Sequence, residues 1–353
     1  MKALGASASI VALGEVMLRF DPGPGRVNTA RRFDVWEGGG EYNVARAMRR
    51  AFGQRAAVVT ALVDNSIGAL IEDLVLQGGV DTRFIQWRKH DGVGRESRNG
   101  LNFTDRGFGP RAGSGCYDRG HTAVSQLSPG DIPWQVVFGE QVPACFHTGG
   151  IFAALGERTG DVALEGMQAA KAKGSLVSFD LNYRASLWLQ REGDRGPGSV
   201  LPRLVQQCDV LFGNAEQFVT CLGAPVTSGS SDVIAARAVE WVQRAFPNIK
   251  GVFCTTRYAS DASQNRWGAI ATWQGETVTI PEQAVAVYDR VGGGDSAAAA
   301  FLYGLLTQRG LSWAARAAVT HGALTMSTPG DNSMVTLEEI ELAMNSEQVR
   351  MVR

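Results

Sequence analysis

Short apolar runs alternate with helical patterns along most of this chain of 353 residues. The runs are typical of buried strands, and apolar residues spaced three and four apart predict helices between them. Strands that alternate with helices of about 10–15 residues form right-handed βαβ units, so the sequence predicts an α/β fold with a mainly parallel sheet covered on both faces. The predicted strands are Ile10–Leu13, Ala56–Ala61, Ala144–His147, Leu176–Asp180, Val210–Phe212 and Val252–Thr255, and the predicted helices are Glu41–Ala51, Ile67–Leu76, Asp161–Lys173, Pro202–Gln207, Ala215–Leu222 and Val233–Phe246.

Two segments interrupt this alternation. Arg19–Trp36 and Gly92–Ala123 are rich in Gly, Pro and Arg, and they hold short extended stretches without a helical period. The second segment is too long for a plain loop in a compact domain. We therefore expect the two segments to form a small β-layer over the sheet, a lid, with two disordered surface loops as the alternative.

Charge and cysteine content narrow the class of protein. The chain carries 34 basic and 35 acidic residues, so its overall charge gives no reason to bind nucleic acid or an acidic membrane. The longest apolar stretch, about Ala297–Leu306, is half of what a membrane span needs. The five cysteines are widely spaced without a C-x-x-C pair, which suits a reducing compartment. We expect a cytoplasmic protein without membrane or nucleic-acid partners.

A glycine-rich turn before an Ala-rich apolar helix is the strongest local signal for chemistry. Gly292, Gly293 and Gly294 precede Asp295, and free N–H groups at a helix start form a site for an anion such as phosphate. A carboxylate is favoured at the same helix end, so we expect Asp295 to stay ionised at neutral pH and to accept a proton from a hydroxyl. The motif indicates phosphoryl transfer, with a simple turn and helix N-cap as the alternative.

Two motifs together resemble a known family. Asp289–Asp295 reads D-R-V-G-G-G-D and is similar to the D-x-x-G-A-G-D signature of the ribokinase-like (PfkB) sugar kinases, and Gly38–Ala45 matches a G-G-x-x-x-N-x-A run of that family. The two motifs stand in the expected order, about 250 residues apart. Within the family, Gly14-Glu15, Tyr117–Arg119 and Phe179–Arg184 most resemble the kinases that act on 2-keto-3-deoxygluconate.

The resemblance covers about residues 10–330 and carries expectations for fold and activity. It implies a ribokinase-like three-layer α/β/α sandwich in one domain, 1–353, with a lid at about 16–37 and 92–123 and a nucleotide-binding part at about 210–335. The implied reaction is phosphorylation of 2-keto-3-deoxygluconate at its terminal hydroxyl by ATP with Mg²⁺. An exposed lid edge strand would also allow a homo-oligomer.

The resemblance also assigns roles to residues of this chain. Asp295 would be the general base, and Gly292, Gly293 and Gly294 would form the anion hole. The substrate would contact residues of both motifs and of the lid: Gly39, Asn43, Asn102, Tyr117, Arg119 and Arg184. Guanidinium groups suit the carboxylate of a sugar acid whatever the family, because they bind it in bidentate fashion. The alternative for Arg184 is a surface salt bridge.

Three positions depart from the family pattern. The family's N-x-x-E element reads Asn214-Ala215-Glu216-Gln217, which leaves Glu216 as a weak, water-mediated candidate for Mg²⁺. On the nucleotide side, Asn214, Thr255 and Arg257 are the candidate contacts, and Asn102 stands where many relatives carry an aromatic residue. A kinase for fructose or another keto-sugar acid, and a non-catalytic sugar-acid sensor, therefore stay open as alternatives.

Overall fold

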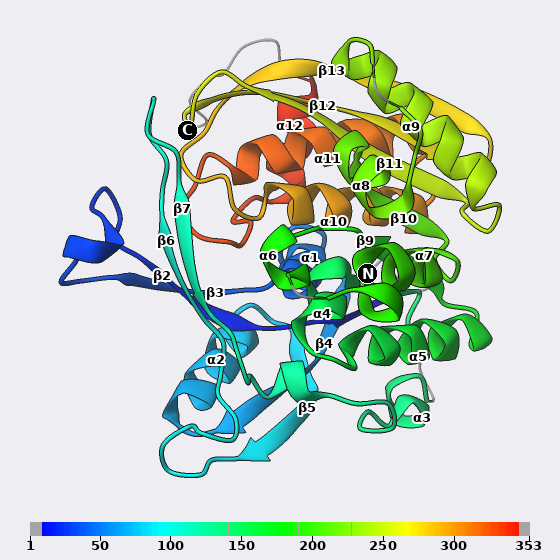
Figure 1. The fold of residues 1–353 in the computed structure, drawn as a ribbon. Helices are drawn as coiled ribbons and strands as arrows, with labels where there is room; N and C mark the ends of the chain where they lie inside the picture. The colour runs from blue at the N-terminus through cyan, green and yellow to red at the C-terminus, as the bar shows by residue number, and fades with distance from the viewer. Residues whose placement is uncertain (1–8, 140–141, 190, 227, 346–353) are drawn as a thin grey trace, which may run out of the picture.

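In the computed structural model of the protein, a large mixed sheet forms the centre of the molecule (Figure 1). The structure describes residues 9–139, 142–189, 191–226 and 228–345. Within these ranges, nine strands pair in the order β13-β12-β11-β10-β9-β8-β1-β4-β5. The strands are β1 (Ser9–Leu13), β4 (Arg55–Asp64), β5 (Asp81–Lys89), β8 (Cys145–Gly149), β9 (Leu176–Asp180), β10 (Val210–Asn214), β11 (Gly251–Ala259), β12 (Gln264–Trp273) and β13 (Glu276–Ala286).

The sheet is parallel from β5 to β11 and ends in the antiparallel strands β12 and β13. Successive side chains of a strand point to opposite faces, so each buried strand supplies two cores. In β1, Ile10 and Ala12 join one core, and Val11 and Leu13 join the other. Apolar runs of this kind form strands because both faces are covered by helices.

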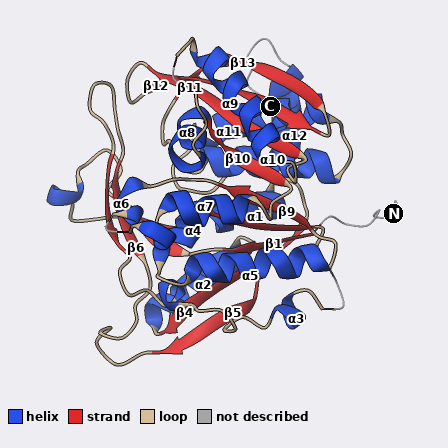
Figure 2. Cartoon of the chain, turned by 45° about the vertical axis from the view of Figure 1, so that its right-hand side comes forward, coloured by secondary structure: helices blue, strands red, loops and turns tan. Residues whose placement is uncertain are grey.

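Helices cover the sheet on both faces, as Figure 2 shows. The first core includes α1 (Gly40–Arg50), α2 (Ser66–Gln77), α10 (Gly293–Leu306), α11 (Leu311–Thr325) and α12 (Leu337–Asn345). The second includes α3 (Trp134–Val137), α4 (Gly150–Leu155), α5 (Thr159–Ala172), α6 (Ala185–Trp188), α7 (Pro197–Val205), α8 (Ala215–Leu222) and α9 (Ser231–Ala245). The predicted three-layer α/β/α fold is confirmed. No helix in the described ranges is both long and apolar enough to cross a membrane.

A second sheet projects from the first and forms the lid (Figure 1). Its strands are β2 (Met17–Asp21), β3 (Asp34–Gly38), β6 (Leu101–Asp105) and β7 (Ser114–Asp118), in the order β3-β2-β6-β7. Phe20 of β2 stacks on Phe103 of β6 at 4.8 Å between ring centroids, and Phe33 packs edge-on against both rings. The two segments that interrupt the helix–strand alternation thus form one ordered layer, and the alternative of disordered loops is wrong.

Some predicted elements differ from the structure in their bounds, and some strands were missed. Helix α7 begins at Pro197 and not at Pro202, because Pro197 takes the first helical turn, where its missing N–H costs nothing. The hairpin of β12 and β13 was not predicted. Its turn, Gln274-Gly275, has positive φ at both residues, which matches a two-residue hairpin turn.

Candidate active site

The candidate site lies at the carboxyl ends of the parallel strands, where ligands bind in open α/β sheets. A cavity of about 1490 Å³ opens there, between the lid and the start of helix α10. Asp180 is the last residue of β9, Asn214 is the last residue of β10, and Asp295 lies in the first turn of α10. The fold therefore brings residues from distant parts of the sequence to one cavity.

Asp295 is held by a contact between the two sequence motifs. Nδ2 of Asn43, in α1, donates a hydrogen bond to Oδ2 of Asp295 at 2.7 Å. The ideal Cβ position at Gly40 lies 3.1 Å from Nδ2 of Asn182 and 3.7 Å from Oδ1 of Asp295, so the backbone of α1 begins in direct contact with both residues. The N-terminal ends of α1 and α10 thus meet at this carboxylate, and Asn43 fixes its orientation while Oδ1 stays open to the cavity.

The sequence predicts that Asp295 stays ionised at neutral pH, but its surroundings leave it only partly ionised there. The pKa of Asp295 is raised to about 7, chiefly by burial. The hydrogen bond from Asn43 opposes this rise, and the charges of Asp180 and Asp331 contribute to it. Helix-end stabilisation is outweighed because several carboxyl groups share one poorly solvated region. A carboxylate with a pKa near 7 is a stronger base than an ordinary aspartate and is well suited to accept a proton at neutral pH.

Two more carboxyl groups lie close to Asp295. Glu41 of α1 is buried, and burial raises its pKa to about 8, with smaller contributions from Asp295 and Asp180. Its Oε2 atom has no hydrogen-bond partner. Burial also raises the pKa of Asp180. Glu41, with a pKa of about 8, holds a proton at neutral pH and so reduces the negative charge beneath the site.

The three glycines of the turn have different surroundings. Gly292 is the N-cap of α10 with φ of 79°, and a Cβ there would lie 1.9 Å from the backbone oxygen of Asp331. A Cβ at Gly293 would lie 3.0 Å from Met326, whereas one at Gly294 would meet nothing within 4 Å. Gly292 therefore shapes the turn, and Gly294 leaves its space open to the cavity, where an anion can approach the N–H groups.

On the lid side of the cavity, the structure brings together Asn102, Tyr117 and Arg119. Asn102 of β6 is 4% exposed, and its Oδ1 atom has no hydrogen-bond partner, so a ligand hydroxyl can donate to it. Arg119 is paired with Glu15: its Nε donates to Oε2 of Glu15 at 2.9 Å, and Nη2 also contacts that oxygen. Arg119 thus offers donors to a ligand but little net charge.

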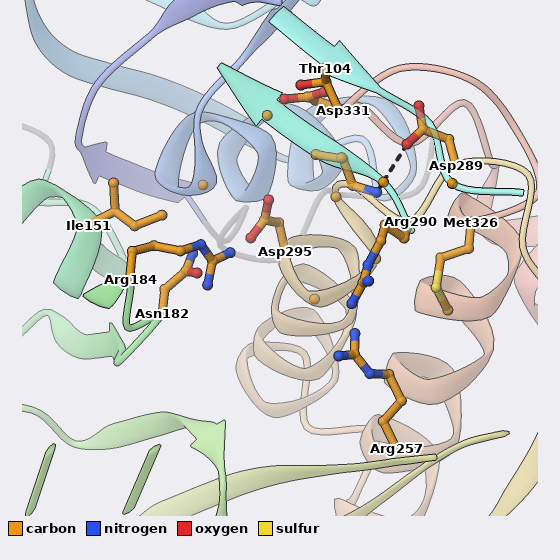
Figure 3. Close-up of a pocket in the computed structure, with 18 of the residues that line it drawn as sticks. Thr104, Ile151, Asn182, Arg184, Arg257, Asp289, Arg290, Asp295, Met326 and Asp331 are labelled. Carbon is orange, nitrogen blue, oxygen red and sulfur yellow. Dashed lines mark hydrogen bonds between the residues drawn. The ribbon is translucent and has the colours of Figure 1, made fainter. Parts of the chain in front are cut away.

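Arg184 lies at the N-cap of α6 and points into the cavity beside Asn182 (Figure 3). Its Nη1 donates to the backbone oxygen of Tyr183 at 3.0 Å, and it forms no ion pair with a described residue. The salt bridge considered as its alternative role is absent from the described part of the chain. Asn182 has φ of 30°, a conformation that non-glycine residues seldom adopt outside functional sites.

The nucleotide candidates line the opposite part of the cavity. Asn214 and Gln217 form a capping box at the start of α8, in which each side chain accepts a hydrogen bond from the other's backbone N–H. Gln217 is thus used structurally and carries no charge. Glu216 is exposed in the first turn of α8, and Thr255 and Arg257 of β11 line the same cavity. No cluster of three or more acidic, His or Cys side chains suited to a metal occurs among the described residues.

A buried ionic cluster joins the lid to the glycine turn. Arg19 of β2 is fully buried, and its guanidinium donates to Asp331 and Asp289 at 2.7 Å each and to Asp21 at 3.2 Å. Arg106, after β6, donates to Asp21 at 2.8 Å. We call Arg19, Asp21, Arg106, Asp289 and Asp331 the lid-base cluster. It fixes the lid against two segments that meet at Gly292: the one before the glycine turn, through Asp289, and the one after α11, through Asp331.

Sequence reasoning missed the lid-base cluster, Asn182, Arg290 and the pair of Glu15 with Arg119. Asp289 and Arg290 lie inside the quoted motif, so their place beside the cavity could have been noted. Arg19 offered no such signal, because its partners Asp289 and Asp331 follow it by 270 and 312 residues.

Comparison with known proteins identifies the family of the chain. The model of the pfkB family carbohydrate kinases matches residues 7–337. The chain belongs to this family, and the resemblance seen in its sequence is confirmed.

Individual relatives share the fold over nearly the whole chain. A 2-dehydro-3-deoxygluconokinase from Thermotoga maritima superposes with a TM-score of 0.88 at 31% identity, covering 96% of this chain and 99% of that one. A 2-dehydro-3-deoxygalactonokinase from Haloferax volcanii is 27% identical over 336 residues, 95% of this chain and 96% of the relative. A 5-dehydro-2-deoxygluconokinase from Clostridium perfringens is 25% identical over 299 residues, 84% of this chain and 80% of the relative.

Proposed function

We propose that this carbohydrate kinase transfers the γ-phosphoryl group of ATP to the terminal hydroxyl of 2-keto-3-deoxygluconate. The product is 2-keto-3-deoxy-6-phosphogluconate. One observation carries the substrate class: Arg184 points into the cavity near Asp295 with no carboxylate partner among the described residues. An unpaired guanidinium suits the carboxylate of a sugar acid, whereas a neutral sugar needs no such charge. The keto-deoxy sugar acids named for the relatives support the same class.

Asp295 acts as the general base in this proposal. It accepts the hydroxyl proton as the oxygen attacks the γ-phosphorus, and Asn43 holds its other oxygen in place. The backbone N–H groups at Gly292–Gly294 stabilise the charge of the transferred group. Gly39 and Asn102 contact the sugar hydroxyls, and Tyr117 and Arg119 close the lid side of the cavity. Asn214, Thr255 and Arg257 contact the nucleotide.

Mg²⁺ fits this site as an ion held mainly by the nucleotide phosphates and water, because that is its usual mode in phosphoryl-transfer sites. Glu216 lines the cavity and is exposed, so it can hold a water ligand of the ion. When bound, the ion would neutralise part of the negative charge on the phosphates.

A substrate panel tests this proposal. ADP release from Mg-ATP would be measured with 2-keto-3-deoxygluconate, 2-keto-3-deoxygalactonate, 5-keto-2-deoxygluconate, gluconate, fructose and ribose. We expect the highest kcat/KM with 2-keto-3-deoxygluconate, and a rise in kcat/KM with pH through about 7 as Asp295 ionises. Asp295→Asn should reduce kcat by about 10³-fold or more, and Asp232→Asn, at an exposed position of α9, should leave it unchanged.

Each other outcome has a definite meaning. Preference for 2-keto-3-deoxygalactonate would support the proposed reaction and the roles of its residues, but the substrate would be the sugar acid named for the Haloferax relative. Preference for fructose or ribose removes the carboxylate role of Arg184. Sugar-acid binding without turnover would favour the sensor, and near-normal kcat in Asp295→Asn would exclude Asp295 as the base.

A further inference from the structure

Two arginines face one another across the phosphate side of the cavity. Figure 3 shows the guanidinium groups of Arg257, from β11, and Arg290, just before the glycine turn, turned toward each other in front of the start of α10. Both residues line the cavity. Neither forms a hydrogen bond or an ion pair with another described side chain. Both side chains are exposed to solvent, so the empty protein tolerates them without a partner and their donors remain available to an anionic ligand.

The pKa of Arg257 reflects its partial burial and the charged groups near it. Burial in the cavity lowers the pKa of Arg257, and the charges of Arg290 and Arg184 lower it further. Glu216 acts in the opposite direction, but it is exposed and not in contact. Arg184, Arg257 and Arg290 therefore form a positive region within a cavity that acidic side chains also line.

The nearest carboxylate cannot neutralise Arg290. Asp289 precedes it in the chain, but its Oδ2 atom accepts from Arg19 at 2.7 Å and from the backbone N–H of Gly330 at 3.2 Å. Its Oδ1 atom accepts from the backbone N–H of Val291 at 3.3 Å. Asp289 lines the cavity, but both of its oxygens are engaged by other groups, and it forms no ion pair with Arg290.

We propose that Arg257 and Arg290 form a clamp for the β- and γ-phosphates of the bound nucleotide, with Arg290 as a catalytic residue in addition to Asp295 and the glycine turn. This inference rests on the proposed function, in which the cavity takes ATP. Opposed guanidinium groups with no protein partner match a polyphosphate, because each can donate two N–H groups to phosphate oxygens.

The clamp has a direct role in the transfer step. The bond from the γ-phosphorus to the β,γ-bridging oxygen breaks as a bond forms from the sugar oxygen to the γ-phosphorus. The hydroxyl proton passes to Asp295, and the bridging oxygen leaves with ADP carrying additional negative charge. Arg257 and Arg290 stabilise that charge, which is greater in the transition state than in bound ATP.

Calorimetric binding of ATP, ADP and AMP, each with Mg²⁺, tests the clamp without any sugar. We expect Arg290→Gln and Arg257→Gln each to weaken ADP and ATP binding by about 10- to 100-fold, because a charged hydrogen-bond donor is lost. AMP binding should change by less than about twofold, because AMP has no β-phosphate. Arg237→Gln, at an exposed position of α9, is the matched control and should change none of the three.

Kinetics separates the catalytic role from binding alone. At saturating ATP and sugar acid, Arg290→Gln should lower kcat by about 10- to 100-fold, and Arg290→Lys should recover part of the loss because it keeps the charge. Thermal unfolding of the unliganded variants should match the wild type, which excludes misfolding as the cause. Equal loss of AMP and ADP binding, or an unchanged kcat in Arg290→Gln, would overturn the clamp.

Failure of the proposed function gives a different pattern. A wild-type protein that binds ADP and ATP but phosphorylates none of the sugars would contradict the kinase assignment while the variants still report on the clamp. A wild-type protein whose ADP affinity is no greater than its AMP affinity would contradict the clamp, whatever the sugar result.

Discussion

The lid-base cluster and the cavity arginines use the same side chain in opposite ways. Arg19 is fully buried and donates to three carboxylates, whereas Arg184, Arg257 and Arg290 lie in the cavity without a carboxylate in contact among the described residues. A buried charge must be compensated within the fold, because its desolvation is costly. A charge that has no partner at a cavity is available to pair with a ligand of opposite charge. Pairing, and not residue type, separates Arg19 from these three arginines of the cavity.

Removal of Arg19 should have the largest effect on stability. Arg19→Met leaves Asp289 and Asp331 buried with no cation in direct contact except Arg106, so we expect the free energy of unfolding to fall by about 3–5 kcal/mol. Arg26→Met is the matched lid control, because Arg26 is paired with Asp105 but is 44% exposed on its side chain. Its loss should cost about 1 kcal/mol or less. Urea unfolding measures both, and equal losses would contradict the distinction between the two regions.

Removal of Arg184 should leave stability unchanged and affect binding. We expect Arg184→Ala to raise KM for the sugar acid by about 10- to 100-fold, because a charge-assisted contact is lost. Its free energy of unfolding should change by less than about 0.5 kcal/mol. Arg203→Ala, on the exposed side of α7, serves as the comparison. A stability loss in Arg184→Ala as large as that of Arg19→Met would place Arg184 among the structural arginines.

Neutralisation of Asp295 should change the free energy of unfolding by less than removal of Arg19 does, and the change should depend on pH. The folded-state pKa of Asp295, about 7, lies above its ordinary value, so folding takes up a proton between about pH 4 and 7. The wild type therefore loses stability as pH rises through this window. Asp295→Asn lacks this loss and should be more stable than the wild type by about 1 kcal/mol at pH 8, with a smaller difference at pH 5. Unfolding curves at pH 5 and pH 8 measure this difference in stability. A difference that is larger at pH 5 than at pH 8 would contradict the raised pKa of Asp295.

The sequence was most informative where local pattern and global fold agree. Alternating apolar runs predicted six strands of the main sheet, because buried parallel strands leave a clear apolar signal. The glycine turn before Asp295 predicted the start of α10, because that combination marks a helix end whatever its surroundings. The two strands of the hairpin were missed for different reasons. β13 lies at the edge of the sheet and is largely exposed, whereas β12 begins with Gln264, Asn265 and Arg266 before its buried run.

The site was less predictable because its electrostatics depend on contacts between distant segments. The raised pKa of Asp295 arises from burial and from Asp180 and Asp331, which no local pattern reveals. Arg119 looks like a free cation in the sequence, yet Glu15 pairs with it 104 residues earlier in the chain. Residue types at a site can thus be predicted from motifs, whereas their charge states require the fold.

The lid-base cluster also constrains the order in which the chain can acquire its structure. Arg19 and Asp331 are 312 residues apart, so this contact cannot form on a ribosome until nearly all of the chain has been synthesised. Loop closure over such a separation is slow compared with local helix formation. An N-terminal fragment that ends before Asp289 therefore has a lid whose arginine lacks the two carboxylates outside its own sheet. Such a fragment should leave its lid undocked and open to proteolysis, so a chain released early would be distinguishable from a finished one by cleavage in this segment.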